Sequence, residues 1–332
     1  MYSPPKPTAL SPLLALLRTM WRGGGDLLSL LPAEAYRMGV GKLGYSRRTI
    51  LLINRPDLLR DLLTDPTDIY PKNDLMVGAL APLVGESIFV SNGPAWRRQR
   101  QMIDPAFSHM RINTAFDAMT AAVDHFEERV LREGEVGRSL DLSMSELTAD
   151  VICRTVFSTA LDNDIAQEVF EAFGVFEREV AQVELKRLIF EPAFTEVPQP
   201  DPVVAACERI RRHLGTLVDR HEAAACPHAD IARAVMDARD GNTGQPFSRK
   251  ELIDQLGVFF LAGHETTASA LTWAFYMLSC QPQILGQLRD EVDAAVGDGP
   301  VRFEDIKKLP FTRNVFREAL RLYPPITFIP RV

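Results

Sequence analysis

A long, mostly apolar run between Ser248 and Pro282 constrains the fold more than any other part of the sequence. It opens with the Ser-x-x-Glu spacing of a capping box, Ser248 to Glu251, and its apolar residues recur at helical spacing from Leu252 to about Cys280. Such a helix is on the order of 45 Å long. Because it is apolar on almost every side, we expect it to be the buried spine of a large helical domain.

The middle of this helix, Ala262 to Thr267, reads Ala-Gly-His-Glu-Thr-Thr, which a purely structural helix does not need. One interpretation is a kink, with threonine hydroxyls bonded back to carbonyls and Glu265 on a hydrated face. The other is a reaction site, where Gly263 lets a flat ligand approach the backbone and Glu265 and Thr266 pass protons to it. A zinc helix of the His-Glu-x-x-His type is excluded, because position 268 is alanine.

The remaining pattern predicts a fold that is mainly α with a small β-sheet. Helical periodicity continues nearly to the end of the chain, and the first half holds one convincing strand, Arg47 to Ile53. Residues 1–30 are rich in proline and glycine and are expected to form a loosely ordered lead-in to a single domain, 31–332. The apolar run Ala9 to Leu17 is interrupted by Pro12 and is too short to span a bilayer, so no membrane anchor is expected.

Composition excludes several classes of function. The formal net charge of -7 argues against nucleic-acid binding. The four cysteines lack the spacing of a zinc site or a disulfide framework, which favours a reducing, cytoplasmic compartment. They are Cys153, Cys207, Cys226 and Cys280.

Two further stretches carry candidate binding residues. Pro94 begins a helix on which Trp96 and Arg100 lie four residues apart, either as part of a solvated basic surface or as a grip for a dianionic ligand. Glu318 and Arg321 lie three residues apart on a later helix and can form an ion pair, which is ordinary by itself.

In this order, the stretches "WRRQR", "AGHETT" and "EALR" followed by "LYPP" resemble those of the cytochrome P450 superfamily, the haem-thiolate monooxygenases. The resemblance covers about Leu31 to Val332 and implies the cytochrome P450 fold. It implies that Gly263, with Ala262, faces the haem and that Glu265 and Thr266 deliver protons to dioxygen. Binding of the haem propionates is implied for Trp96, Arg100 and Arg331, and a structural role is implied for Glu318 and Arg321.

The resemblance also implies an activity and its partners. Members use haem b to insert one oxygen atom of O2 into a hydrophobic organic substrate, with electrons from a ferredoxin, a flavodoxin or a reductase. Arg97 and Arg98 are candidates for contact with such an acidic donor. The family's Phe-x-x-Gly-x-x-x-Cys-x-Gly loop, which carries the axial cysteine, does not occur up to Val332. We therefore expect the C-terminal part of the fold to be missing, no metal ligand in this chain, and no turnover by the chain alone.

Two alternatives have a different chemistry. One is a non-catalytic fragment or an interaction module without haem, which an exposed apolar face would support. The other is a dinucleotide-binding enzyme, suggested by the Gly-x-Gly-x-x-Gly pattern of Gly39 to Gly44. It is disfavoured, because this stretch follows a helical pattern and precedes a strand, the reverse of what such a site requires.

Overall fold

The computed structural model describes most of the chain. The described residues are 10–22, 31–43, 49–64, 68–107, 109–134, 137, 139–160, 168, 171–176, 191–192, 198–223, 230–297 and 299–332. Cys226 and residues 185–190 and 193–197 lie outside them.

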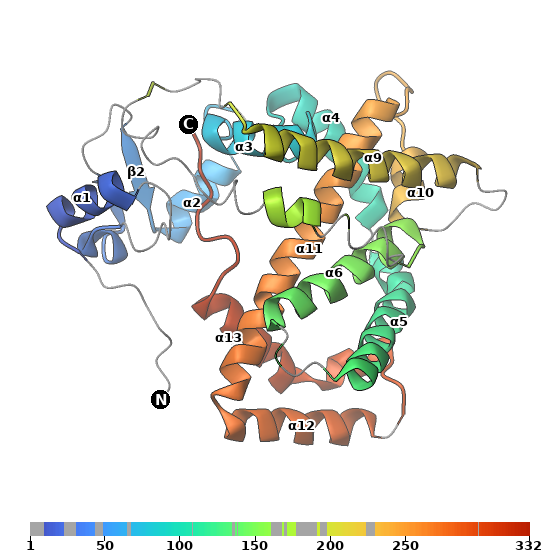
Figure 1. Cartoon of the computed structure of the whole chain (residues 1–332). Helices are drawn as coiled ribbons and strands as arrows, with labels where there is room; N and C mark the ends of the chain where they lie inside the picture. The colour runs from blue at the N-terminus through green and yellow to red at the C-terminus, as the bar shows by residue number, and fades with distance from the viewer. Residues whose placement is uncertain are drawn as a thin grey trace.

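Helix α11, Arg249–Ser279, runs as a column through the middle of the molecule (Figure 1). Its N-terminus is the capping box expected from the sequence. The Ser248 hydroxyl accepts a hydrogen bond from the Glu251 N–H, and the Glu251 carboxylate accepts one from the Ser248 N–H. The helix ends one residue before Cys280, as its apolar pattern predicts. This confirms the long central spine.

Helices surround this column on several sides, and α6 crosses its middle (Figure 1). The other long helices are α5 His109–Glu133, α6 Leu140–Phe157, α9 Asp201–Ala223, α12 Pro282–Val296 and α13 Pro310–Leu322. The shorter helices are α1 Pro12–Arg22, α2 Pro56–Leu63, α3 Asp74–Val84, α4 Gly93–Ile103 and α10 Ile231–Met236. Short 3-10 helices are η2 Ala33–Tyr36, η3 Asp104–Phe107 and η4 Phe303–Lys308.

The sheet of the described residues is one antiparallel hairpin. Strand β1, Val40–Leu43, pairs with β2, Ile50–Ile53, with Val40 opposite Ile53. A mainly α fold with a small sheet is thus confirmed. The glycine pattern that begins at Gly39 runs into β1, a hairpin strand with no following helix, so it lacks the strand, turn and helix of a dinucleotide site.

The main core lies where α3, α6, α9 and α11 meet, and it includes Leu83, Phe157, Ile210 and Leu256. A smaller apolar cluster joins α4, η3 and α10 to the start of α11. No helix among the described residues is long and apolar enough to cross a membrane.

The segment expected to form a loose lead-in contains helix α1. Pro12, which interrupts the apolar run, occupies the first position of this helix. Proline is tolerated there because the first helical N–H groups have no partner within the helix. Pro12, which the sequence pattern suggested as an interruption, is therefore the first residue of a helix.

Candidate functional site

The centre of the candidate site is the point where α6 crosses α11. Gly263 lies at this crossing, and a Cβ atom added to it would stand 2.2 Å from Cδ1 of Ile152 on α6. The two helices approach so closely because residue 263 has no side chain. On the side that faces α6, Ile152 fills the space that a side chain at position 263 would take, and the approach of a ligand to Gly263 stays a prediction.

His264 fixes α11 against the same neighbour. Its ring is buried between Phe260 and Phe173, and its Nε2 atom lies 2.6 Å from the hydroxyl of Ser145 on α6. The hydroxyl of Thr148, also on α6, lies 3.0 Å from the His264 carbonyl oxygen. Burial lowers the pKa of the imidazole to about 4, so the ring is neutral near pH 7. His264 is a packing residue here and not a metal ligand.

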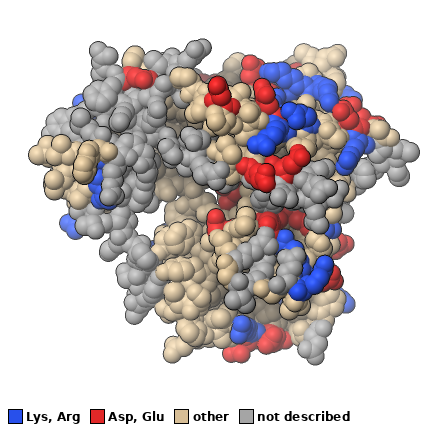
Figure 2. Space-filling model, in the orientation of Figure 1, with Lys and Arg blue, Asp and Glu red and all other residues tan. Residues whose placement is uncertain are grey.

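The next two residues turn away from this contact. The Thr266 hydroxyl donates a hydrogen bond of 2.6 Å to the carbonyl oxygen of Ala262, four residues earlier, as expected of a threonine inside a helix. Glu265 is accessible to solvent, yet the protein around it removes enough hydration to raise the pKa of its carboxyl group. Both facts fit a side chain on a concave surface, which water reaches but protein surrounds. Figure 2 shows the molecule hollowed between its N-terminal elements and the α9 to α11 part.

A second part of the site is a pair of cations. Residues far apart in the sequence meet here, because Lys72 and Arg331 form an isolated antiparallel bridge and Val332 donates its N–H to the Pro71 carbonyl. The Lys72 ammonium group donates hydrogen bonds to the carbonyls of Ile88, at 2.9 Å, and Ser91, and it lies 5.8 Å from the ring centroid of Trp96.

Among the described residues, no carboxylate pairs with either of these two cations. Desolvation, and then repulsion by Arg331, lowers the pKa of Lys72 to about 8, and burial also lowers the pKa of Arg331. In the described part of the chain, neither forms an ion pair, and the side-chain hydrogen bond recorded for Arg331 goes to its neighbour Pro330. An anion bound here would relieve both charges. The arrangement fits carboxylates such as the propionates of haem.

The other arginines of α4 already have partners. Arg100 is exposed and forms an ion pair with Asp104 at 2.6 Å, one turn along the helix. Arg97 forms an ion pair with Asp68. Arg98 turns inward, toward Asp240 at 3.1 Å and Glu251 at 2.6 Å. Arg98, which is partly exposed, is therefore held by two carboxylates of the protein, and its contact with an electron donor stays a prediction.

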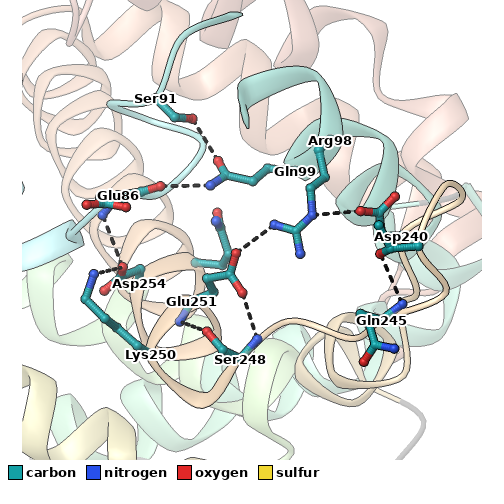
Figure 3. A network of polar contacts seen from close by, with 12 residues as sticks. Glu86, Ser91, Arg98, Gln99, Asp240, Gln245, Ser248, Lys250, Glu251 and Asp254 are labelled. Atoms are coloured by element: carbon teal, nitrogen blue, oxygen red, sulfur yellow. Dashed lines mark hydrogen bonds and ion pairs between the residues drawn. The ribbon is translucent and has the colours of Figure 1, made fainter. Parts of the chain in front are cut away.

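The contacts of Arg98 belong to a polar network that positions α4 relative to α11 (Figure 3). Gln99, the next residue, accepts a hydrogen bond from the Ser91 hydroxyl and donates one to the Glu86 carbonyl, both at 2.8 Å. Glu86 in turn donates its N–H to Asp254 of α11 at 3.1 Å. The network holds the loop between α3 and α4 in place, and this loop supplies the two carbonyls that bind Lys72.

Glu318 and Arg321 form the ion pair expected from their spacing, with two hydrogen bonds of 2.7 Å on the exposed face of α13. Two of the described cysteines, Cys153 and Cys207, are poorly suited to offer a thiolate to a metal. Cys153 and Cys207 lie in the main core, where burial raises the pKa of each thiol to about 12, and Cys280 is exposed at the end of α11. No cluster of metal-ligating side chains occurs among the described residues.

Sequence reasoning missed two contributors, Lys72 and Ser145. Lys72 lies in a stretch without periodicity, and only the tertiary contact with Arg331 reveals its role. Ser145 falls on α6, where a serine has no local signal apart from its spacing from Thr148. To predict either residue from the sequence, one would have to know which distant segments meet in the fold.

The comparisons with known proteins agree with one another. A family model described as Cytochrome P450 matches residues 38–332. The chain is 31% identical over 328 residues to the cyclooctat-9-en-7-ol 5-monooxygenase of Streptomyces melanosporofaciens, an alignment that covers 97% of this chain and 68% of that protein. It is 30% identical over 279 residues to a bifunctional cytochrome P450/NADPH-P450 reductase of Acremonium egyptiacum, covering 80% of this chain and 26% of that protein.

A structural comparison gives the same result. The chain matches the crystal structure of a cytochrome P450 with a TM-score of 0.71 and 22% identity, over 88% of this chain and 68% of that one. This similarity confirms the fold expected from the sequence. The chain spans only part of the length of each of these proteins.

Proposed function

Because the chain belongs to the cytochrome P450 superfamily, we propose that it acts in a haem-dependent monooxygenase reaction, in which one oxygen atom of O2 enters a hydrophobic organic substrate. The observation that carries the proposal is the meeting of two desolvated cations, Lys72 and Arg331, beside the indole of Trp96. Such a cluster is suited to hold the paired carboxylates of haem b.

The residues divide into a binding group and a proton-handling group. Lys72, Trp96 and Arg331 hold the propionates, and Ala262 on α11 contacts the haem. When bound, haem supplies the redox centre at which dioxygen is activated. The expected role of Arg100 in propionate binding requires it to leave Asp104. Glu318 and Arg321 keep a structural role on α13.

Glu265 and Thr266 handle protons. Because its pKa is raised, the Glu265 carboxyl group holds its proton to a higher pH than an ordinary glutamic acid does. The Thr266 hydroxyl donates a hydrogen bond to the Ala262 carbonyl, and it can donate one to a ligand only after rotating away from that carbonyl. The pair can then relay a proton from solvent, which reaches Glu265.

Electrons come from an external donor of the ferredoxin, flavodoxin or reductase type. Among the relatives, one carries a reductase in the same chain. The described cysteines are free thiols, which supports a reducing, cytoplasmic setting.

Haem titration into the purified chain, followed by absorption in the Soret region, tests the proposal. We expect saturable binding, weakened about tenfold or more by Lys72→Met and by Arg331→Met, because each removes a charge-assisted contact. The exposed Lys307 and Arg317 supply matched controls, since Lys307→Met and Arg317→Met leave the cluster intact. If all four variants bind haem equally well, Lys72 and Arg331 are not part of the haem site. If the unaltered chain takes up no haem, the proposal is wrong.

A second candidate is an interaction module without haem. It is favoured by large apolar side chains exposed near the contact of α11 with α13, namely Trp273, Phe275, Tyr276 and Phe316. The same titration separates the two candidates, because only the monooxygenase requires haem uptake.

A further inference from the structure

The contact between helix α11 and the loop that follows α3 contains two buried polar groups that the monooxygenase proposal does not use. They are the hydroxyl of Ser87 and the side-chain amide of Gln255, and both residues are 0% exposed. In the described part of the chain, Oγ of Ser87 and Nε2 of Gln255 have no hydrogen-bond partner. A buried polar group without a partner costs free energy, so almost all such groups in folded proteins bind protein or ordered water.

The orientation of the Gln255 amide is fixed by its other end. Its Oε1 atom accepts a hydrogen bond of 3.1 Å from the Ile88 N–H, which the amide oxygen can do and the amide nitrogen cannot. Exchanging the two ends by half a turn would bring the NH2 group against that N–H, and two donors would then face each other. The Gln255 amide therefore cannot satisfy Nε2 by turning around.

The Ser87 hydroxyl belongs to the same contact. Ser87 directly precedes Ile88, whose N–H binds the Gln255 amide, so both unsatisfied groups flank one hydrogen bond between the loop and α11. The backbone of Ser87 is already satisfied, because its N–H donates to the Val84 carbonyl at 3.2 Å and its carbonyl accepts the Ser91 N–H at 2.9 Å. Of the polar groups of Ser87, the hydroxyl is therefore the one that needs a further partner.

A second buried glutamine shows how an amide at this loop is satisfied by protein alone. Gln99 accepts a hydrogen bond from the Ser91 hydroxyl and donates one to the Glu86 carbonyl, each at 2.8 Å (Figure 3). Gln255 has the first kind of bond and lacks the second. The group that completes its amide must be small, because neither Ser87 nor Gln255 is exposed to solvent.

We propose that Ser87 and Gln255 form an internal binding site for one water molecule. Water can accept a hydrogen bond from Nε2 of Gln255 and form a second one with the Ser87 hydroxyl, as buried waters commonly do. A cation does not bind to N–H donors, and burying an anion without a counterion is costly. The water would tie residues 85–92 to α11, and this loop supplies the two carbonyls that bind Lys72.

The sign of a stability change tests this inference without haem, so its result is independent of the monooxygenase proposal. If water is bound, Ser87→Ala removes one of its partners, and we expect the unfolding equilibrium constant to rise about tenfold. If nothing is bound, the same change removes a buried hydroxyl that has no partner, and it should be neutral or stabilising. Urea unfolding of the purified chain measures the difference. An unfolding constant that is unchanged or lower would overturn the inference.

Two other serines supply the controls, and a crystal structure of the purified chain supplies a second measurement. Ser91→Ala breaks the direct bond to Gln99 and should destabilise the chain, whereas Ser139 is exposed and Ser139→Ala should have little effect. Because poorer packing also destabilises a protein, the water must be located directly. We expect it within about 3.2 Å of both Oγ of Ser87 and Nε2 of Gln255. A direct bond between these two side chains, or no water at this position, would also overturn the inference.

Discussion

At the scale of single residues, Glu265 is a group whose surroundings change its acid–base chemistry. Its pKa is raised because protein replaces part of its hydration. The native state therefore binds this proton more tightly than the unfolded state does. By linkage, protonation stabilises the fold, and stability falls as pH rises from the unfolded pKa, near 4.5, through the raised native pKa.

Glu265→Gln should therefore raise the thermal unfolding midpoint at neutral pH, because the amide carries no charge to desolvate. The advantage should shrink as pH falls below 4.5, where the carboxyl group of the unaltered chain is protonated in both states. Thermal unfolding between pH 3 and pH 8 measures it, with Glu304→Gln as an exposed control. A variant that is less stable, or a difference independent of pH, would contradict this account.

Gly263 is the second residue whose environment is restrictive. Gly263→Ala would place Cβ 2.2 Å from Ile152, and overpacking of this kind costs about 1–3 kcal/mol, more than the ~1 kcal/mol that alanine adds to helix stability. Gly286→Ala on α12 is the matched control, since nothing lies within 4 Å of its new Cβ, and it should be stabilising. Denaturant unfolding measures both. The double variant Gly263→Ala/Ile152→Ala should lose less free energy of unfolding than the sum of the two single variants, because Ile152→Ala removes the clash.

At the scale of elements, the start of α11 depends on local chemistry that the sequence displays. Ser248→Ala should cost about 1 kcal/mol, because the Glu251 N–H loses the hydroxyl that caps it. Ser139 occupies the same position at the start of α6 but makes no capping hydrogen bond with its side chain. Ser139→Ala should therefore have little effect, and urea unfolding of the two variants compares them directly. Equal losses would mean that the capping bond at α11 contributes nothing.

At the scale of the whole molecule, one buried carboxylate joins three elements of the core. Asp254 of α11 accepts hydrogen bonds from Arg211 of α9, at 2.6 Å, and from the N–H of Glu86 beyond α3, at 3.1 Å. The Arg211 guanidinium also donates to the Leu83 carbonyl at 2.9 Å. The carboxylate leaves no room for a side chain at Gly85, where an added Cβ would lie 2.2 Å from it.

Asp254→Asn should destabilise the whole fold by about 3 kcal/mol, because it leaves the Arg211 charge without its counterion in the core. The exposed pair of Asp219 with Arg249 supplies the comparison. Asp219→Asn should change stability by about 1 kcal/mol or less, since surface pairs contribute little. Global unfolding in urea measures both losses. Similar values would show that burial does not decide the strength of these pairs.

The sequence by itself determined the elements whose causes are local. The length and both ends of α11 follow from a capping box and a periodic apolar run, and the partners Glu318 and Arg321 follow from helical spacing. These features depend on residues within a few positions of one another. The motif Ala262 to Thr267 indicated the family for the same reason, since its residues are consecutive in the sequence.

Tertiary structure alone decided what depends on distant segments. It showed that Gly263 makes room for Ile152, that Arg98 turns inward to Asp240 and Glu251, and that Lys72 lies beside the C-terminal Arg331. A sequence states which groups are present, but close packing and the pairing of desolvated charges depend on the segments that folding brings together.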